Sequence, residues 1–188
     1  MRINFASSNP HKIAEASDIL REFGIEIKPV KVKKLEIQSD SLHEIAQVAA
    51  LHAARQLGSA VVVEDAGLYI DALNGFPGPY SAYVFRTIGN RGILKLMDGI
   101  QDRRARFVSV VAYAEPNGFI KTFEGITKGM ISYRPRGNKG FGFDPIFIPE
   151  GGGGLTYAEM DMELKNKVSH RGKAFREFAR WFKAQKGG

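Results

Sequence analysis

Residues 60–67 read Ala-Val-Val-Val-Glu-Asp-Ala-Gly, a run of β-branched residues that ends in two neighbouring carboxylates. Such a run is typical of a buried strand, and ligands of open α/β sheets bind at the carboxyl ends of strands. A carboxylate there could bind Mg²⁺ or take a proton from water. Because side chains alternate along a strand, Glu64 and Asp65 should point to opposite faces, and only one of them would be catalytic. The pattern does not choose between them, and it leaves open whether residues 67–73 continue the strand or form a hairpin.

Alternating strand and helix patterns precede this segment. Residues 2–6 have the pattern of a short strand, and Ser-Ser-Asn-Pro at 7–10 supplies a capping side chain and an early proline for a helix over 10–23. Apolar residues recur at helical spacing within that helix. A second strand is expected at 25–32, and a Ser-x-x-Glu capping box begins a second helix over 41–57.

More elements are expected between residue 75 and the C-terminus. Gly-Phe-Pro-Gly-Pro at 75–79 predicts an irregular loop, and Glu-Pro-Asn-Gly at 115–118 predicts a hairpin turn. The other predicted elements are a helical region at 80–97 with a break near 89–90, strands at 103–114 and 119–133, a basic loop at 134–142, a short strand at 145–149, a glycine connection at 151–154 and a last helix over 165–185.

The element order predicts an α/β protein whose long central sheet mixes parallel and antiparallel strands and is flanked by helices. The 188 residues suit a single domain over 1–188 without an independent linker. Hydrophobic residues make up 44% and charged residues 25%, which is ordinary for a globular protein. The chain has no cysteine, which excludes disulfides, thiolate catalysis and cysteine-bound zinc. Since it has neither an apolar stretch of about 18 residues nor a signal-peptide pattern, we expect a cytoplasmic protein.

The formal net charge is +7, and much of the surplus lies near the C-terminal end. Residues 164–188 contain eight Lys or Arg residues and one acid, Glu177. Such a surface could meet nucleic acid or an anionic small molecule, and it could equally be a solvated helix face.

The helix expected after the first strand offers a site for phosphate, because a helix N-terminus has free N–H groups and a partial positive charge. Side-chain donors and a lysine in the first turn favour this interpretation, although an ordinary helix cap has the same pattern. The segment is not a P-loop, since no G-x-x-x-x-G-K-[ST] occurs. The candidate residues are Ser7, Ser8, Asn9, Pro10, His11 and Lys12.

Three further segments could complete a nucleotide site. Glu36 follows the second expected strand and could approach the same sheet edge as Asp65. The run Gly-Phe-Gly-Phe-Asp-Pro at 140–145 could present an aromatic ring to a base, and such stacking is worth roughly 1–3 kcal/mol. Residues 165–171 supply several donors where the last helix begins. Each segment also suits ordinary structure, as a surface glutamate, a tight turn with core anchors or a basic helix start.

Five motifs occur together in the order and at the spacing of one enzyme family. They are S-x-N-x-x-K at 7–12, V-x-E-D-A-G-L at 62–68, G-x-P-G-P-Y-S at 75–81, G-F-G-F-D-P at 140–145 and K-N-x-V-S-H-R at 165–171. On these motifs the chain resembles the inosine triphosphate pyrophosphatase family, also called non-canonical purine NTP pyrophosphatases. The similarity covers essentially the whole chain, and a T-x-A-E-M segment at 156–160 fits it as well.

The resemblance implies hydrolysis of non-canonical purine nucleoside triphosphates (ITP, dITP and XTP) to the monophosphate and pyrophosphate. It also implies Mg²⁺ as cofactor, a homodimer, and two lobes with the active-site cleft between them. Asp65 would be the general base and a metal ligand, and Glu36 would be a further metal ligand. Residues 7–12 would hold the triphosphate, and Ala66 would touch the substrate. The implied nucleoside pocket consists of Phe141, Gly142, Phe143, Asp144, Lys165, His170 and Arg171.

Two other functions stay open on the sequence alone. A nucleotide pyrophosphatase for another modified base, such as a modified pyrimidine, would need the same phosphate and metal groups. A nucleic-acid-binding module would explain the pI of about 9.6. The acids Glu36, Glu64 and Asp65 would, however, be out of place in a groove that binds a polyanion.

Overall fold

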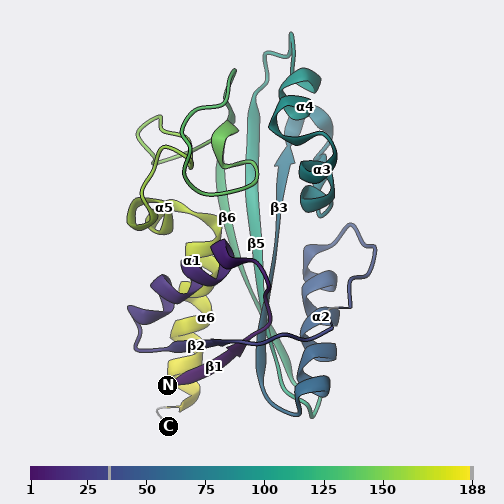
Figure 1. Cartoon of the computed structure of the whole chain (residues 1–188), viewed down its shortest axis with the longest axis vertical. Helices are drawn as coiled ribbons and strands as arrows, with labels where there is room; N and C mark the ends of the chain where they lie inside the picture. Colours follow the sequence, from purple (N-terminus) through teal and green to yellow (C-terminus); the bar gives the residue numbers. More distant parts are fainter. Residues whose placement is uncertain (34, 187–188) are drawn as a thin grey trace. The chain divides into compact units, whose positions relative to one another are not determined.

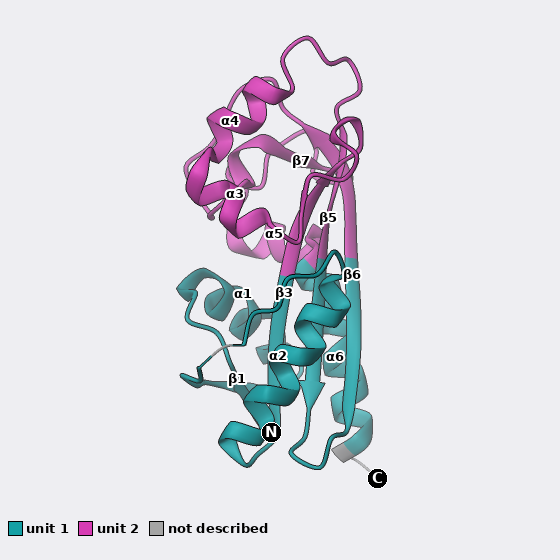
Figure 2. Ribbon diagram, turned by 90° about the vertical axis from the view of Figure 1, so that its right-hand side faces the viewer, with its two compact units in different colours: residues 1–65, 109–125, 171–188 teal, residues 66–108, 126–170 magenta. Residues whose placement is uncertain are grey.

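The computed structural model of the chain describes residues 1–33 and 35–186. Its contacts divide it into two compact units, which Figure 2 shows in different colours. Unit 1 consists of Met1–Asp65, Ser109–Gly125 and Arg171–Gly188, and unit 2 consists of Ala66–Val108 and Ile126–His170. Each unit has its own apolar core.

The described residues form seven strands, six α-helices and two short 3₁₀ turns (Figure 1). The strands are β1 (Arg2–Phe5), β2 (Glu26–Pro29), β3 (Val61–Ile70), β4 (Pro77–Gly78), β5 (Arg104–Ala114), β6 (Ile120–Ile131) and β7 (Phe147–Pro149). The helices are α1 (Pro10–Arg21), α2 (Leu42–Leu57), α3 (Ser81–Thr87), α4 (Gly89–Leu96), α5 (Met162–Val168) and α6 (His170–Lys186). The 3₁₀ turns are Asp71–Leu73 and Asp144–Ile146.

The strands form one sheet of mixed direction, so the predicted α/β class with a mixed sheet is confirmed. The strand order is β2-β1-β3-β5-β6-β7, and β4 pairs with β3 beside this path. β1 pairs in parallel with β2 and β3, whereas the pairs β3–β4 and β6–β7 are antiparallel. Gly118 N–H donates to the Glu115 carbonyl at 3.0 Å and closes the predicted turn between β5 and β6.

The core of unit 1 forms where α1 and α6 pack on its strands. In α1 the buried residues Ala16, Ile19 and Leu20 lie on one side of the helix, as the periodicity predicts. The Phe5 ring of β1 packs edge-on against Phe175 of α6, with ring centroids 5.7 Å apart. Figure 1 shows α2 on the opposite side of these strands from α1 and α6, so helices cover both faces of the strands in unit 1.

The helix α2 begins and ends where its sequence predicts. Ser41 caps the N-terminus, because its Oγ accepts a hydrogen bond from Glu44 N–H at 3.3 Å. Gly58 ends the helix with φ 62°, a left-handed conformation that glycine adopts without steric cost.

The core of unit 2 is largely aromatic. Phe107 packs edge-on against Phe147 with ring centroids 4.8 Å apart, and Tyr157 lies 5.2 Å from Phe147. All three side chains are buried. The helices α3 and α4 are separate and divide at Ile88, which confirms the predicted break near 89–90.

β3 continues to Ile70, and a 3₁₀ turn at Asp71–Leu73 then reverses the chain toward β4, so both alternatives that the sequence left open for residues 67–73 hold in part. The prediction of an irregular loop at 75–79 is wrong in part, because this segment contains the two-residue strand β4. β4 pairs with the second half of β3, with Leu68 opposite Gly78.

The pairing of β3 with β4 depends on a close approach of two glycines. A Cβ atom on Gly67 would lie 2.4 Å from the Gly78 carbonyl oxygen, so no larger residue fits at position 67 without a shift of the backbone. Ser81 reinforces this contact, since its Oγ accepts from Leu68 N–H at 2.8 Å and donates to the Gly78 carbonyl at 2.7 Å. The G-x-P-G-P-Y-S motif therefore has a structural role in unit 2.

The prediction of one last helix over 165–185 is wrong. The chain forms two helices, α5 and α6, which divide at Ser169, where the backbone is extended with ψ 153°. Thr127 Oγ1 donates to the Val168 carbonyl at 2.8 Å and satisfies an acceptor at the end of α5. The sequence hides this break, because residues 165–170 contain neither glycine nor proline.

Two predicted strands are shorter in the structure. β2 covers Glu26–Pro29 rather than 25–32, and β7 covers only Phe147–Pro149 because a 3₁₀ turn precedes it. Within residues 1–33 and 35–186, no helix has both the length and the apolar character needed to cross a membrane.

Candidate active site

The predicted phosphate segment lies where β1 leads into α1. Asn9 is the N-cap residue of α1, and its Oδ1 accepts from His11 N–H at 3.0 Å and from Lys12 N–H at 3.4 Å. Ser7 Oγ in turn accepts from Asn9 N–H at 3.3 Å. Two N–H groups of the first turn are thus used by the cap itself, which leaves the exposed Ser8 and the half-buried Lys12 as donors for an anion.

A buried network of charged side chains connects α1, β3, β5 and the start of α6 within unit 1. Lys12 Nζ lies 2.8 Å from Glu64 Oε2 and forms an ion pair with it. Arg171 Nε donates to Glu64 Oε1 at 3.1 Å, and Arg171 Nη1 donates to Glu15 Oε2 at 2.5 Å. Ser109 Oγ donates to Glu64 Oε1 at 2.7 Å. In these contacts two cations, Lys12 and Arg171, face two carboxylates, Glu15 and Glu64.

The network keeps Glu64 ionised. Burial by itself would raise the pKa of Glu64, but the charges of Arg171 and Lys12 and the hydrogen bond from Ser109 outweigh it and hold the pKa well below its ordinary range. A carboxylate held in this way is a poor proton acceptor at neutral pH. Of the two acids that end the valine run, Glu64 is therefore a structural ion-pair partner.

Asp65 has a different environment. It is the next residue of β3 and is half-buried, whereas Glu64 is fully enclosed. The opposite orientations expected for the two side chains account for this contrast. Asp65 is therefore the carboxylate of this pair that water and a ligand can reach.

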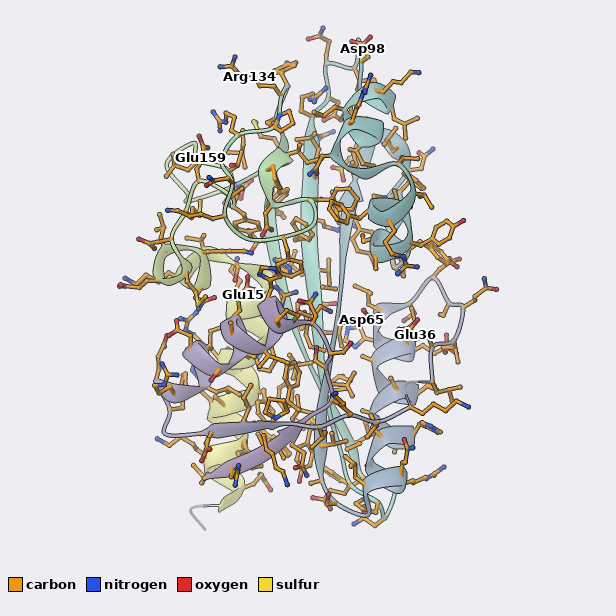
Figure 3. The ribbon with its side chains drawn as sticks, in the orientation of Figure 1. Glu15, Glu36, Asp65, Asp98, Arg134 and Glu159 are labelled. Atoms are coloured by element: carbon orange, nitrogen blue, oxygen red, sulfur yellow. The ribbon has the colours of Figure 1, made fainter. Side chains whose placement is uncertain are left out.

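Glu36 lies in the segment between β2 and α2, and its side chain is exposed. Figure 3 labels Glu36 and Asp65, which come from two different segments of unit 1. No cluster of three or more His, Asp or Glu side chains with the arrangement of a metal site occurs among the described residues. Two accessible carboxylates still fit Mg²⁺, because this ion usually keeps several water ligands and binds through one or two carboxylates together with substrate phosphates.

The second group of predicted site residues belongs to unit 2. Asp144 Oδ2 accepts from Phe141 N–H at 2.8 Å and from Lys165 Nζ at 2.6 Å, and both charged groups are buried. A Cβ on Gly140 would lie 2.1 Å from Asp144 Oδ2, so glycine is required where the loop closes around the carboxylate. Asp144 and Lys165 thus fix the shape of the Gly140–Asp144 loop.

The two phenylalanines of this loop have different environments. Phe143 is buried and packs edge-on against Phe85 of α3, with ring centroids 5.4 Å apart. Phe141 is only half-buried, and Lys165 Nζ lies 5.1 Å from the centre of its ring. Asn90 of α4 donates to the Gly142 carbonyl at 3.1 Å and holds the loop from another side. Phe141 is therefore the ring of this loop that a base could reach.

His170 and Ala66, both of unit 2, complete the predicted set. His170 is 2% exposed, and its ring stacks on Phe107 at a centroid distance of 4.6 Å. Ala66 follows Asp65 on β3 and is half-buried. The structure thus joins Lys12 with Arg171 in unit 1 and joins Phe141, Asp144 and Lys165 in unit 2.

Residues 3–181 match the sequence model that is described as the Ham1 family. This chain belongs to the Ham1 family. The family membership confirms the resemblance that the five motifs indicate.

Three relatives that match nearly the whole of this Ham1-family chain carry the same name. A protein of Methanopyrus kandleri named dITP/XTP pyrophosphatase is 55% identical over 183 residues, which are 97% of either chain. Proteins with the same name from Hyperthermus butylicus and Pyrobaculum aerophilum are 50% and 51% identical over 181 residues; the alignments cover 96% of this chain and 94% and 96% of theirs.

Solved structures of Ham1 proteins share the fold. A Ham1 protein of Coxiella burnetii is 33% identical with a TM-score of 0.86, and covers 98% of this chain and 99% of its own. A Mycobacterium abscessus protein titled nucleoside-triphosphatase / dITP/XTP pyrophosphatase is 37% identical with a TM-score of 0.73, over 95% of this chain and 98% of its own.

Sequence reasoning missed three polar residues that support the site of this Ham1-family protein. Glu15 and Ser109 belong to the buried network around Arg171 and Glu64, and Asn90 holds the Gly142 carbonyl. Glu15 could have been found, because it follows Lys12 by three residues on the side of α1 that is otherwise apolar. Ser109 and Asn90 gave no signal, because their partners are distant in sequence.

Proposed function

We propose that this Ham1-family protein hydrolyses the non-canonical purine nucleoside triphosphates ITP, dITP and XTP to the monophosphate and pyrophosphate. One observation carries the proposal: a protein named dITP/XTP pyrophosphatase is 55% identical over 183 residues, nearly the whole of both chains. The environments of Asp65 and Phe141 support it, since both side chains are partly accessible.

In this proposal Asp65 and Glu36 hold Mg²⁺, which when bound would neutralise charge on the phosphates. Asp65 also orients a water molecule and accepts a proton from it. The water oxygen forms a bond to the α-phosphorus, the bond from that phosphorus to the bridging oxygen breaks, and pyrophosphate leaves. The half-buried position of Asp65 supports this role, because a base must be reached by water.

Lys12 and the start of α1 hold the triphosphate in the proposed enzyme. Lys12 Nζ lies 3.4 Å from the Glu64 carbonyl oxygen as well as 2.8 Å from the Glu64 carboxylate. These contacts fix the ammonium group beside the residue that precedes Asp65 on β3. A preorganised cation at this position stabilises charge that develops on the phosphates without the cost of reorganisation.

Base selection belongs to unit 2 in this proposal. Phe141 stacks on the purine, and Gly142, Phe143, Asp144 and Lys165 shape the loop that carries this ring. A 6-keto oxygen accepts a hydrogen bond where the amino group of adenine would leave a donor unpaired, and such sites can reject the wrong base by several orders of magnitude. His170, Arg171 and Ala66 remain proposed contacts of the nucleoside.

Four further features are proposed on the same grounds. They are Mg²⁺ as cofactor, a homodimer, a cytoplasmic location and two lobes with the active site in the cleft between them. The resemblance to the family implies the cofactor, the homodimer and the two lobes, and the expected location follows from the lack of a signal-peptide pattern and of a long apolar stretch.

A substrate panel with pyrophosphate as the readout tests the function. With Mg²⁺ present, we expect rapid release from ITP, dITP and XTP, and turnover of ATP lower by several orders of magnitude. The panel includes GTP and modified pyrimidine triphosphates, which also decides the alternative of another modified base. The proposal fails if ITP, dITP and XTP all stay intact.

A further inference from the structure

Unit 2 contains a cavity of about 480 Å³ that none of the proposed active-site residues lines. It lies between the start of β5, the end of β6 and the chain that follows β6. Its volume is in the range of about 300–1,000 Å³ that is usual for small-molecule sites. The charged and aromatic residues that line it are Asp102, Arg103, Arg104, Tyr133, Arg134 and Arg136, and the Met130 side chain lies among them.

The guanidinium group of Arg103 carries a charge that no carboxylate of residues 1–33 and 35–186 neutralises. Arg103 is only 8% exposed. Its Nε, Nη1 and Nη2 donate to the carbonyls of Ile131, Met97 and Ser132 at 3.0, 2.8 and 2.7 Å. Because a buried charge without a counter-charge is costly, the wall of the cavity favours an anion.

Arg134 adds a second charge of the same kind. The other two arginines of the cavity are paired, Arg104 with Asp102 at 2.7 Å and Arg136 with Glu159 at 3.4 Å. Arg134 is exposed, and its side chain forms neither an ion pair nor a hydrogen bond with the part of the chain that the structure describes. Figure 3 labels Arg134 at the periphery of unit 2. The cavity therefore presents two unneutralised guanidinium groups, and a phosphate monoester carries a charge of about −1.5 to −2.

An aromatic platform lies beside these charges. The Tyr133 ring covers the Arg103 guanidinium, with the central carbon 4.6 Å from the ring centre, so one ring face is occupied. Tyr133 is nevertheless 77% exposed, and the apolar side chain of Met130 nearby is 49% exposed. The free ring face offers stacking to a base, because every base has a π-face and an arginine–tyrosine pair is already stacked beneath it.

We propose that this cavity is a second nucleotide site, which binds a nucleoside monophosphate with its phosphate on Arg103 and Arg134 and its base on Tyr133. The volume, the charge and the platform each fit this one occupant. The cavity wall is also bonded to the chain that follows the Gly140–Asp144 loop, since Ser132 N–H donates to the Ile146 carbonyl at 2.8 Å and Arg136 N–H to the Pro145 carbonyl at 2.9 Å. A bound monophosphate thus stiffens the segment next to that loop.

Calorimetric titration of the full chain with AMP, at low salt and without Mg²⁺, tests the proposal. AMP is neither a proposed substrate nor a proposed product. We expect one AMP bound per chain. The affinity should be about tenfold lower in Arg134→Ala, which loses one phosphate contact, and about tenfold lower in Tyr133→Ala, which loses one stacking contact. Both side chains are exposed, so both variants should fold. The matched control is Arg55→Ala, which removes an exposed arginine of α2 in unit 1 and should bind AMP as the unchanged protein does.

Three results would overturn the proposal: no AMP binding to the unsubstituted protein, an affinity in Arg134→Ala or Tyr133→Ala equal to that of the unsubstituted protein, or loss of AMP binding in a folded Lys12→Ala variant. The last result would place AMP in the proposed active site instead. A single-stranded oligothymidylate that binds through Tyr133 more tightly than AMP would replace the monophosphate with a nucleic acid strand as the occupant. Hydrolysis of ITP is measured in a separate assay. If the protein does not hydrolyse ITP, AMP binding at this cavity can therefore still be confirmed or refuted.

Discussion

At the scale of single residues, the two neighbouring acids of β3 show how environment assigns different roles to the same functional group. Glu64 is enclosed by Arg171, Lys12 and Ser109, whereas Asp65 is half-buried and accessible to water. The sequence narrowed the base to these two residues through the end of the valine run. The strand pattern could not choose between them, because the cations beside Glu64 come from positions 12 and 171, and only the resemblance to the family selected Asp65.

Asp65→Asn should abolish pyrophosphate release from ITP while the protein stays folded. The substitution removes the proposed base and one metal ligand, so we expect a loss of at least about 100-fold in kcat. Stability should change little, because the side chain is half-buried and asparagine has nearly the same size and shape as aspartate. Steady-state kinetics and thermal unfolding measure both effects, and near-full turnover in this variant would contradict the assignment.

Glu64→Gln should destabilise the protein, because it removes the buried carboxylate that pairs with Lys12 and Arg171. We expect the free energy of unfolding to fall by about 3 kcal/mol, as is typical when a buried ion pair loses one partner. Glu22→Gln is the matched control, since Glu22 pairs with Arg176 at 3.0 Å near the surface and should cost less than about 1 kcal/mol. Urea unfolding at pH 7 measures the free energy of unfolding of both variants. Equal losses in the two variants would show that burial does not increase the contribution of the Glu64 ion pairs to stability.

The lowered pKa of Glu64 also predicts how stability depends on pH. A carboxyl group whose pKa is lower in the folded state stabilises that state above its unfolded pKa, here 4.5, and loses this contribution as the pH falls toward the folded value. Below pH 4.5 the free energy of unfolding should therefore fall more steeply in the unchanged protein than in Glu64→Gln. Urea unfolding at several pH values, with a chelator present, would reveal equal slopes if this interpretation is wrong.

At the scale of secondary-structure elements, the sequence predicted where most helices begin and end but not where strands pair. Ser41 and Gly58 are local signals, and the ends of α2 lie where they indicate. The β3–β4 pair and the break at Ser169 depend on partners elsewhere in the chain, such as Gly78 and Thr127. Helix signals are local in sequence, whereas these features arise from tertiary contacts, and that is why they were missed.

Gly67→Ala should weaken the pairing of β3 with β4. The added Cβ would lie 2.4 Å from the Gly78 carbonyl oxygen, so the backbone must shift, and overpacking of this kind costs about 1–3 kcal/mol. Gly58→Ala is the matched control, because a Cβ added at Gly58 has nothing within 4 Å. This substitution should cost only about 1 kcal/mol, for the left-handed conformation of the backbone. Thermal unfolding compares the two, and a smaller loss for Gly67→Ala would contradict the close approach.

At the scale of the whole molecule, the family and the mixed α/β sheet could be predicted from motif order alone, since each motif kept its spacing along the chain. The division of the candidate site could not be predicted. Lys12 and Arg171 are joined through acids in unit 1, whereas Asp144 and Lys165 are joined in unit 2. The motifs identify the candidate site residues, but they do not show which of these residues form ion pairs with one another.

Removal of metal should abolish activity without unfolding the molecule. The proposed Mg²⁺ ligands are two accessible carboxylates, and both units have apolar cores that need no metal. A chelator should therefore reduce pyrophosphate release to background and leave the midpoint of thermal unfolding unchanged, and added Mg²⁺ should restore turnover. A large fall in that midpoint would instead indicate a structural metal.

The extended backbone at Ser169 has a consequence for how the chain can vary in length. Because of it, two adjacent residues pack in different units. The His170 ring stacks on Phe107 in unit 2, while Arg171 donates hydrogen bonds to Glu15 and Glu64 in unit 1. Each residue of a helix rotates the following side chains by about 100° around the helix axis. An insertion or deletion of one amino acid in α5 or at its end would therefore turn His170 or Arg171 away from its partners, even if the other of the two kept its contacts. Natural length variants of this protein should therefore accumulate in the surface turns and avoid the stretch from Lys165 to Arg171.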